Sequence, residues 1–203
     1  AIFGGGSDTG VFVDVLDYFG DILNHGEIEA PSNAVHLSIG TLHGQVTNTG
    51  TITASGPNGV AVALEIGNGT TFTNESDGLI KGDVILGGHA AYRFIGHDGG
   101  VEGDILGNGA SVLSSAAHDD RLLVSDGTQY FVDGQLANLL SFDVEDGGIA
   151  VMGGRFIGDP DGPGYGATNV DALNVHEGGR LYLDNNSILH VGTFSQEAGG
   201  ELT

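Results

Sequence analysis

A short phrase recurs along the N-terminal part of the chain, and this repetition constrains the fold more than any other feature. Residues 20–30 read GDILNHGEIEA, and residues 44–54 read GQVTNTGTITA. A third copy, FTNESDGLI, occupies residues 72–80, and the asparagines of the three phrases are spaced by 24 and 26 residues. A repeat of this length, made of short apolar strands and glycine-containing turns, predicts a solenoid in which each repeat forms one coil.

A second alignment supports the same architecture. The stretch GLIKGDVILG (78–87) aligns with GGVEGDILGN (99–108), which matches Ile80 with Val101 and Val84 with Ile105 at an offset of 21 residues. One coil cannot bury its inward side chains, but stacked coils with strands about 4.8 Å apart share a continuous core. We therefore predict an all-β parallel β-helix with roughly 20–26 residues per coil, which forms a rod on the order of 40 Å long.

The repeated asparagines predict a ladder at one turn of the solenoid. The ladder consists of Asn24, Asn48 and Asn74, and each side chain is expected to bond the backbone of the adjacent coil. The glycines that follow them are expected to adopt backbone angles that other residues avoid. These glycines are Gly26, Gly50 and Gly78.

The alternative interpretation makes the asparagines sugar contacts or sites of N-glycosylation. Asn74 in Asn-Glu-Ser and Asn68 in Asn-Gly-Thr are formal acceptor sequences. The spacing of the phrases favours the structural interpretation.

Composition narrows the class of partner. The formal charge of −22 arises from 27 acidic residues against five basic ones, so the chain lacks the clustered lysine and arginine that nucleic-acid binding requires.

The glycine and apolar content bears on the fold class. Glycine reaches 38 of 203 residues without the Gly-X-Y period of collagen. Apolar residues make up 39% of the chain, which favours a folded β-rich protein over a disordered one.

The sequence of the repeated unit changes from about residue 119. The new unit is an apolar strand, a glycine pair and a second apolar strand, as in DVEDGGIAVMGG (143–154), NVHEGGRLYL (174–183) and GTFSQEAGGEL (192–202). This pattern also predicts stacked strands joined by tight turns. We therefore expect residues 1–203 to form a single β-helix, as a fragment of a longer chain.

These units together resemble a known family. VTNTGTITA (46–54), LANLLSFDVEDGGIAVMGG (136–154) and HVGTFSQEAGGELT (190–203) are similar to passenger domains of bacterial autotransporters, the type V secretion proteins. The resemblance implies a right-handed β-helix, exported across the outer membrane to the bacterial cell surface or the extracellular space. It further implies a secreted repeat protein such as an adhesin, with a role in virulence.

The function expected on this basis is that of a non-enzymatic structural or adhesive module. Its partners would be a host or neighbouring-cell surface, through glycan or matrix, and a second copy of the chain docked end to end into filaments. Exposed aromatic side chains would supply contacts. The candidates are Tyr18, Tyr92, Tyr130 and Tyr165.

A calcium ion is the one cofactor that the sequence suggests. The stretch GDPDGPGYG (158–166) places Asp159 and Asp161 among glycines and prolines, and carboxylate oxygens suit Ca²⁺. A surface loop explains the same stretch without an ion. The eight histidines are dispersed and match no zinc motif.

An enzyme is the alternative function, either a polysaccharide lyase or hydrolase built on the β-helix or the stalk of an autotransporter protease. Glycoside cleavage requires two carboxyl groups at a defined separation. Acidic groups cluster at Asp119–Asp120, Asp143–Glu145–Asp146 and Asp159–Asp161, without a tryptophan as a sugar platform. Since no Ser–His–Asp motif is visible either, we expect no catalytic residues.

Overall fold

The structure of the chain is a computed structural model. It describes residues 3–4, 8–57, 59–67, 71–88, 91–96, 99–107, 121–132, 135–137, 139–153, 156–157, 170–184, 188–189 and 191–203. This part of the chain is all-β and contains no helix, so no helix in it is long and apolar enough to cross a membrane.

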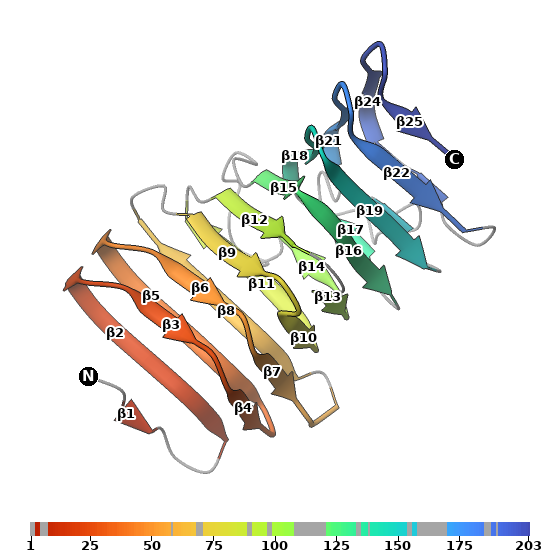
Figure 1. Ribbon diagram of the computed structural model, residues 1–203. Helices are drawn as coiled ribbons and strands as arrows, with labels where there is room; N and C mark the ends of the chain where they lie inside the picture. Colours follow the sequence, from red (N-terminus) through yellow and green to blue (C-terminus); the bar gives the residue numbers. More distant parts are fainter. Residues whose placement is uncertain are drawn as a thin grey trace.

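Each coil contributes one strand to each of three sheets, which we call A, B and C. Neighbours within a sheet are three elements apart in the sequence, as in the orders β2-β5-β8 and β3-β6-β9. Among the described strands the pairing is parallel, except that β1 runs antiparallel to β2. Figure 1 shows the coils stacked in chain order from the N-terminal to the C-terminal end. The predicted parallel β-helix is confirmed.

The strands of each sheet follow one another in chain order. Sheet A contains β1 (Phe3–Gly4), β2 (Thr9–Phe19), β5 (Asn33–His43), β8 (Val60–Ile66), β11 (Asp83–Gly88), β14 (Ile105–Leu106), β17 (Gln135–Ala137), β20 (Phe156–Ile157) and β23 (Ile188–Leu189). Sheet B contains β3 (Ile22–Asn24), β6 (Val46–Asn48), β9 (Thr71–Glu75), β12 (Ala91–Ile95), β15 (Arg121–Ser125), β18 (Leu139–Val144), β21 (Val170–Val175) and β24 (Val191–Gln196). Sheet C contains β4 (Glu27–Ala30), β7 (Thr51–Ala54), β10 (Leu79–Lys81), β13 (Gly99–Glu102), β16 (Gly127–Val132), β19 (Gly148–Gly153), β22 (Arg180–Leu183) and β25 (Glu201–Leu202).

The register confirms the repeats found in the sequence and shows where the period changes. Ile80 pairs with Val101 across β10 and β13, at the expected offset of 21 residues. In sheet B, Val144 follows Val124 by 20 residues, but Val175 follows Val144 by 31. Short and long coils therefore alternate in the C-terminal half, because the connections between strands differ in length while the paired strands keep their positions.

The core is a set of columns of apolar side chains that run along the stack. In sheet A one column pairs Val35, Val62, Val84, Ile105 and Leu136 in successive coils, and each of these side chains is at most 5% exposed. Burying one such side chain stabilises the fold by about 1.5–3 kcal/mol. Since a single coil leaves its inward side chains uncovered on both sides, this core exists only when coils stack.

The first coil differs from those that follow. Leu16 and Phe19 of β2 are 80% and 76% exposed, and Leu23 of β3 is 55% exposed. Their strands lie at the N-terminal end of the stack (Figure 1). The described part of the chain therefore presents an apolar surface at this end.

Candidate functional site

The three repeated asparagines form the ladder that the sequence predicts, at the turn from sheet B to sheet C. Asn24 Nδ2 donates to Asn48 Oδ1, and Asn48 Nδ2 donates to Asn74 Oδ1, both at 2.7 Å. Each amide also donates to a backbone carbonyl in its own turn, that of Gly26, Gly50 or Gly78.

The hydrogen bonds of this ladder differ from the expected pattern in one respect. The link between coils runs from side chain to side chain, not from side chain to the backbone of the adjacent coil as predicted. Asn48 and Asn74 are 1% and 0% exposed, so neither can be glycosylated or touch a sugar in the folded protein. Asn68 lies outside the described residues.

The glycines of the ladder are required for a different reason from the one predicted. Positive φ angles occur at other glycines, but not at Gly26, Gly50 or Gly78. A Cβ on Gly50 would lie 2.0 Å from the Gly26 carbonyl oxygen. One on Gly78 would lie 2.8 Å from the backbone carbonyl oxygen of Asn48 and 2.5 Å from Asn74 Oδ1 in its own turn. A Cβ on Gly26 would meet nothing within 4 Å. Close approach of stacked turns, rather than backbone angle, therefore excludes a side chain at the second and third coils.

The repeated Gly-Asp dipeptides place a carboxylate beneath the next coil. Asp21 Oδ1 accepts a hydrogen bond from the backbone N–H of Gln45, and Asp83 Oδ1 accepts one from that of Asp104. The preceding glycines, Gly20 and Gly82, have φ angles of +122° and +115°. The two dipeptides lie at different corners, since Asp21 precedes β3 of sheet B whereas Asp83 is the first residue of β11 in sheet A.

Asp83 is held in an unfavourable environment for its charge. Burial raises the pKa of its carboxyl group, and the nearby Asp104 carboxylate raises it further, against the lowering effect of the hydrogen bond from the Asp104 backbone.

In the glycine pairs of the C-terminal half, the first glycine has a positive φ angle and the second lies too close to the preceding coil for a side chain. In the pair Gly147–Gly148 the first residue has a φ of +74°, and a Cβ on the second would lie 2.2 Å from the Val124 carbonyl oxygen. The Gly148 N–H donates to the Glu145 oxygen and closes the turn. Gly178–Gly179 and Gly199–Gly200 repeat this arrangement.

A polar cluster covers the outer face of sheet B near the C-terminal end of the stack. Its centre is Asp143 on β18, which is 9% exposed. Asp143 accepts hydrogen bonds from Ser141 Oγ and from Asn174 Nδ2, the latter at 2.8 Å. His176 Nε2 lies 3.1 Å from Asp143 Oδ1, and His176 Nδ1 lies 3.2 Å from Glu197 Oε1.

The cluster joins three successive coils. Asp143 lies on β18, His176 follows β21 and Glu197 follows β24. The hydrogen bond with Asp143, and then that with Glu197, raise the pKa of His176, although partial burial opposes the rise. The hydrogen bond from the Glu177 backbone N–H, and then that from His176, lower the pKa of the Glu197 carboxyl group.

This arrangement is not a nucleophilic triad. Ser141 donates to Asp143 rather than to the histidine, and both ring nitrogens of His176 face carboxylate oxygens. A histidine held in this way has no free nitrogen with which to activate a hydroxyl group. The cluster therefore connects three successive coils through side-chain hydrogen bonds.

Most of the acidic sites named from the sequence lie elsewhere or outside the described residues. The predicted calcium ligands, Asp159 and Asp161, are outside them, and so are Asp119–Asp120. Within the part of the chain that the structure describes, no group of three or more His, Asp or Glu side chains could hold a metal ion. Of the Asp143–Glu145–Asp146 group, Asp143 enters the polar cluster, and Glu145 pairs with Arg93 at 3.5 Å.

The tyrosines predicted to be contact residues differ in their exposure to solvent. Tyr130 on β16 is 43% exposed, as expected, whereas Tyr92 is 1% exposed and packs in the core, so that prediction was wrong. Tyr18 packs partly buried against the core, and Tyr165 lies outside the described residues. Tyr92 sits on β12 in register with Phe72 and Leu122, which face the interior.

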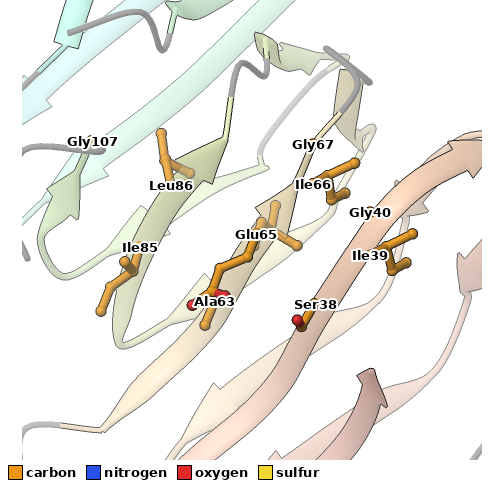
Figure 2. Close-up of a pocket in the computed structure, with 12 residues that line it drawn as sticks. Ser38, Ile39, Gly40, Ala63, Glu65, Ile66, Gly67, Ile85, Leu86 and Gly107 are labelled. Carbon is orange, nitrogen blue, oxygen red and sulfur yellow. The ribbon is translucent and has the colours of Figure 1, made fainter. Parts of the chain in front are cut away.

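A groove of about 490 Å³ lies along strands β5, β8 and β11 of sheet A. Figure 2 shows that Ser38, Ala63, Glu65 and Ile85 line it on these three neighbouring strands. Its remaining lining is aliphatic or glycine. None of the site residues predicted from the sequence lies there.

Two structural residues were missed by the sequence analysis. His176 was taken as one of the dispersed histidines, since its partners are 33 and 21 residues away in the sequence. Gln129 is fully buried, and its Nε2 donates to the Gly96 carbonyl oxygen of the preceding coil at 3.1 Å. The only hint of His176 in the sequence is its place before a glycine pair.

Comparison with protein-family models, with curated proteins and with solved structures finds no match to this chain. The β-helical architecture therefore rests on the structure itself, and the resemblance to autotransporter passenger domains stays a prediction.

Proposed function

We propose that this chain is a non-enzymatic structural or adhesive module of an autotransporter-like protein at the bacterial surface. The observation that supports this most is how the described polar side chains are used. The asparagine ladder, the Asp21 and Asp83 corners and the Asp143 cluster all bond one coil to the next. A protein that uses its polar groups in this way is built as a stiff rod.

Its partner would be a host or neighbouring-cell surface, through a glycan or matrix component. The surface carries a strong negative charge, which disfavours nucleic acid and anionic surfaces and favours neutral or cationic partners. Tyr130, on the outer face of sheet C, is the aromatic side chain we expect to contribute to such a contact.

Self-association end to end is the second part of the proposal. Leu16, Phe19 and Leu23 expose apolar surface at the first coil, and strand edges at such an end can pair with another copy. Heterologous contacts of this kind propagate into filaments.

The test is sedimentation and electron microscopy of the chain over a concentration series, with and without Ca²⁺, beside binding to a glycan array. We expect rods that lengthen into filaments as concentration rises. A variant carrying Leu16→Ser and Phe19→Ser should remain as single rods, whereas Tyr130→Ser should form filaments normally and lose glycan binding. Single rods of the unaltered chain at every concentration, without glycan binding, would contradict the proposal.

The enzyme alternative has one specific observation in its favour. Asp143 and Glu197 are carboxyl groups on either side of His176, in a polar cluster on an outer sheet face. Incubation with acidic and neutral polysaccharides, followed by reducing-end and unsaturated-product assays, tests it. Cleavage that disappears in Asp143→Asn would replace the structural proposal with a catalytic one.

A further inference from the structure

We propose that His176 is an acid-closed clamp that fastens the coil containing β24 and β25 to the coils before it. This inference goes beyond the structural function proposed above, because it concerns how the stack responds to pH. It rests on the geometry of three side chains from three successive coils.

The clamp requires the histidine to be doubly protonated. His176 Nε2 lies 3.1 Å from Asp143 Oδ1, and Nδ1 lies 3.2 Å from Glu197 Oε1. A neutral imidazole has one N–H and can donate to only one of these acceptors, whereas an imidazolium donates to both. Protonation therefore converts one bond between neighbouring coils into a charge-assisted bridge across three.

The surroundings fix both carboxylates in place. Asp143 is nearly buried and accepts further hydrogen bonds from Ser141 and Asn174. Glu197 accepts from the Glu177 backbone N–H at 3.1 Å. The acidic groups on the packed elements are Asp143, Glu145 and Asp146 from β18 and its turn, Asp171 of β21, Glu177 beside the histidine, and Glu197 from the turn after β24. The basic groups are Arg121 of β15, the strand next to β18, and Arg93 of β12, which pairs with Glu145.

Besides the pairing of β24 with β21 and of β25 with β22, the coil that the clamp holds is joined to the one before it by the hydrogen bond from Ser195 Oγ to Asn174 Oδ1 at 2.6 Å and by the ion pair of Arg180 with Glu201 at 3.3 Å. Along β24 only Val191 is partly buried, and the remaining side chains of the strand are exposed. Both residues of β25 are exposed as well. Local opening of a coil with few buried side chains costs less free energy than opening of the core, so the loss of one bridge is expected to lower its protection from hydrogen exchange measurably.

The direction of the pH effect follows from the raised pKa of His176. A histidine whose pKa is higher in the folded state stabilises that state fully below its ordinary pKa of about 6.5. The stabilisation is lost as pH rises through the folded-state pKa. The clamp is therefore closed in acid and opens toward alkaline pH.

Hydrogen exchange of the intact 203-residue chain tests the clamp. Protection factors, corrected for the intrinsic pH dependence of exchange, are measured from pH 5.5 to 8.5 for residues 191–203 and for β18. We expect protection of residues 191–203 to fall about tenfold across this range, because deprotonation of the imidazolium removes one charge-assisted hydrogen bond between coils. The NMR titration of His176 should share its midpoint, and β18 should change little.

Two variants separate the clamp from general effects of pH. His176→Gln should give low protection of residues 191–203 at every pH, and Glu197→Gln should reduce the pH dependence. His36→Gln, a histidine on β5 that contacts Phe12, should behave as the unaltered chain. A flat pH profile in the unaltered chain, a titration midpoint at or below that of free histidine, or an unchanged profile in His176→Gln would each overturn the proposal.

Discussion

The N-terminal and C-terminal halves of the stack place different residue types at the turn that follows sheet B. One column of paired residues lies where sheet B ends, and it continues through all the described coils. Its members, in order, are Asn24, Asn48, Asn74, Phe94, Val124, Val144, Val175 and Gln196. The first three are amides bonded to one another, and the next four are apolar side chains in the core.

The difference follows from how each turn satisfies its own backbone. In the first two coils the turn is short, and the asparagine amide bonds both the N–H and the carbonyl of a glycine two residues on. In the glycine-pair turns the backbone closes on itself, as in the bond from Gly148 N–H to Glu145 O. Turns that close in this way hold valine at the column position in two coils, at Val144 and Val175. The Asn74 turn has both features, since Gly78 N–H donates to Glu75 O and the asparagine amide donates to Gly78 O.

The largest effect is expected from filling the space above a stacked turn. Gly50→Ala places a Cβ about 2.0 Å from the Gly26 carbonyl oxygen, and Gly148→Ala places one 2.2 Å from that of Val124. Because the clash is with backbone, neighbouring coils must separate, and we expect a loss of about 3 kcal/mol or more of unfolding free energy in each. Urea denaturation followed by circular dichroism measures it.

Gly26→Ala is the matched control, since its Cβ meets nothing within 4 Å. We expect a change within about 0.5 kcal/mol. If Gly26→Ala cost as much as Gly50→Ala, close approach between coils would not be the reason for these glycines.

A smaller loss is expected from cutting the amide ladder. Asn48→Ala leaves the side-chain oxygen Oδ1 of Asn74 and the backbone carbonyl of Gly50 without their donor, and we expect it to cost about 2–3 kcal/mol. Val144→Ala, in the same column, removes two buried methyl groups and should lower the unfolding free energy by about 1–2 kcal/mol. Chemical denaturation of both variants gives the comparison.

A double-mutant cycle sharpens this difference between the halves. Asn48 and Asn74 should be coupled by about 1 kcal/mol or more, because each supplies a hydrogen-bonding partner to the other. A larger coupling between Val124 and Val144 would show that packing, and not the amide bonds, dominates the column.

The smallest change in unfolding free energy is expected at Asp83, whose carboxylate is partly buried. Asp83→Asn keeps the oxygen that accepts from the Asp104 backbone and removes a carboxylate whose pKa is raised by burial. The raised pKa stabilises the fold only below the ordinary aspartate pKa, and this contribution is lost as pH rises through the folded-state value. The variant should therefore be more stable at pH 7, by less than about 1 kcal/mol because the site is partly exposed.

The gain should disappear as the pH approaches 3, where the native carboxyl group is also protonated. Thermal unfolding of both proteins from pH 3 to 7 measures the trend. A variant that is less stable at pH 7 would show that the charge of Asp83 contributes favourably to the hydrogen bond.

Much of the fold was predictable because the solenoid repeats itself in sequence. The spacing of Asn24, Asn48 and Asn74 predicted the ladder, and the alignment of Ile80 with Val101 predicted their pairing. The inward position of Tyr92 was not predictable, since adjacent strand residues face opposite sides and the register decides which side is the core. The polar cluster was not predicted, because Asp143, His176 and Glu197 come from three coils and are separated by 33 and 21 residues in the sequence.

The sequence by itself determined that the chain forms stacked coils, because equivalent residues recur at intervals that only a solenoid can bring together. It also determined which residue types fill each turn. Only the tertiary structure decided what those residues contact. Gly50 is required by a carbonyl in another coil, and His176 gains its partners from coils 33 and 21 residues away. Connections of unequal length set these distances, so contacts between coils cannot be read from local sequence.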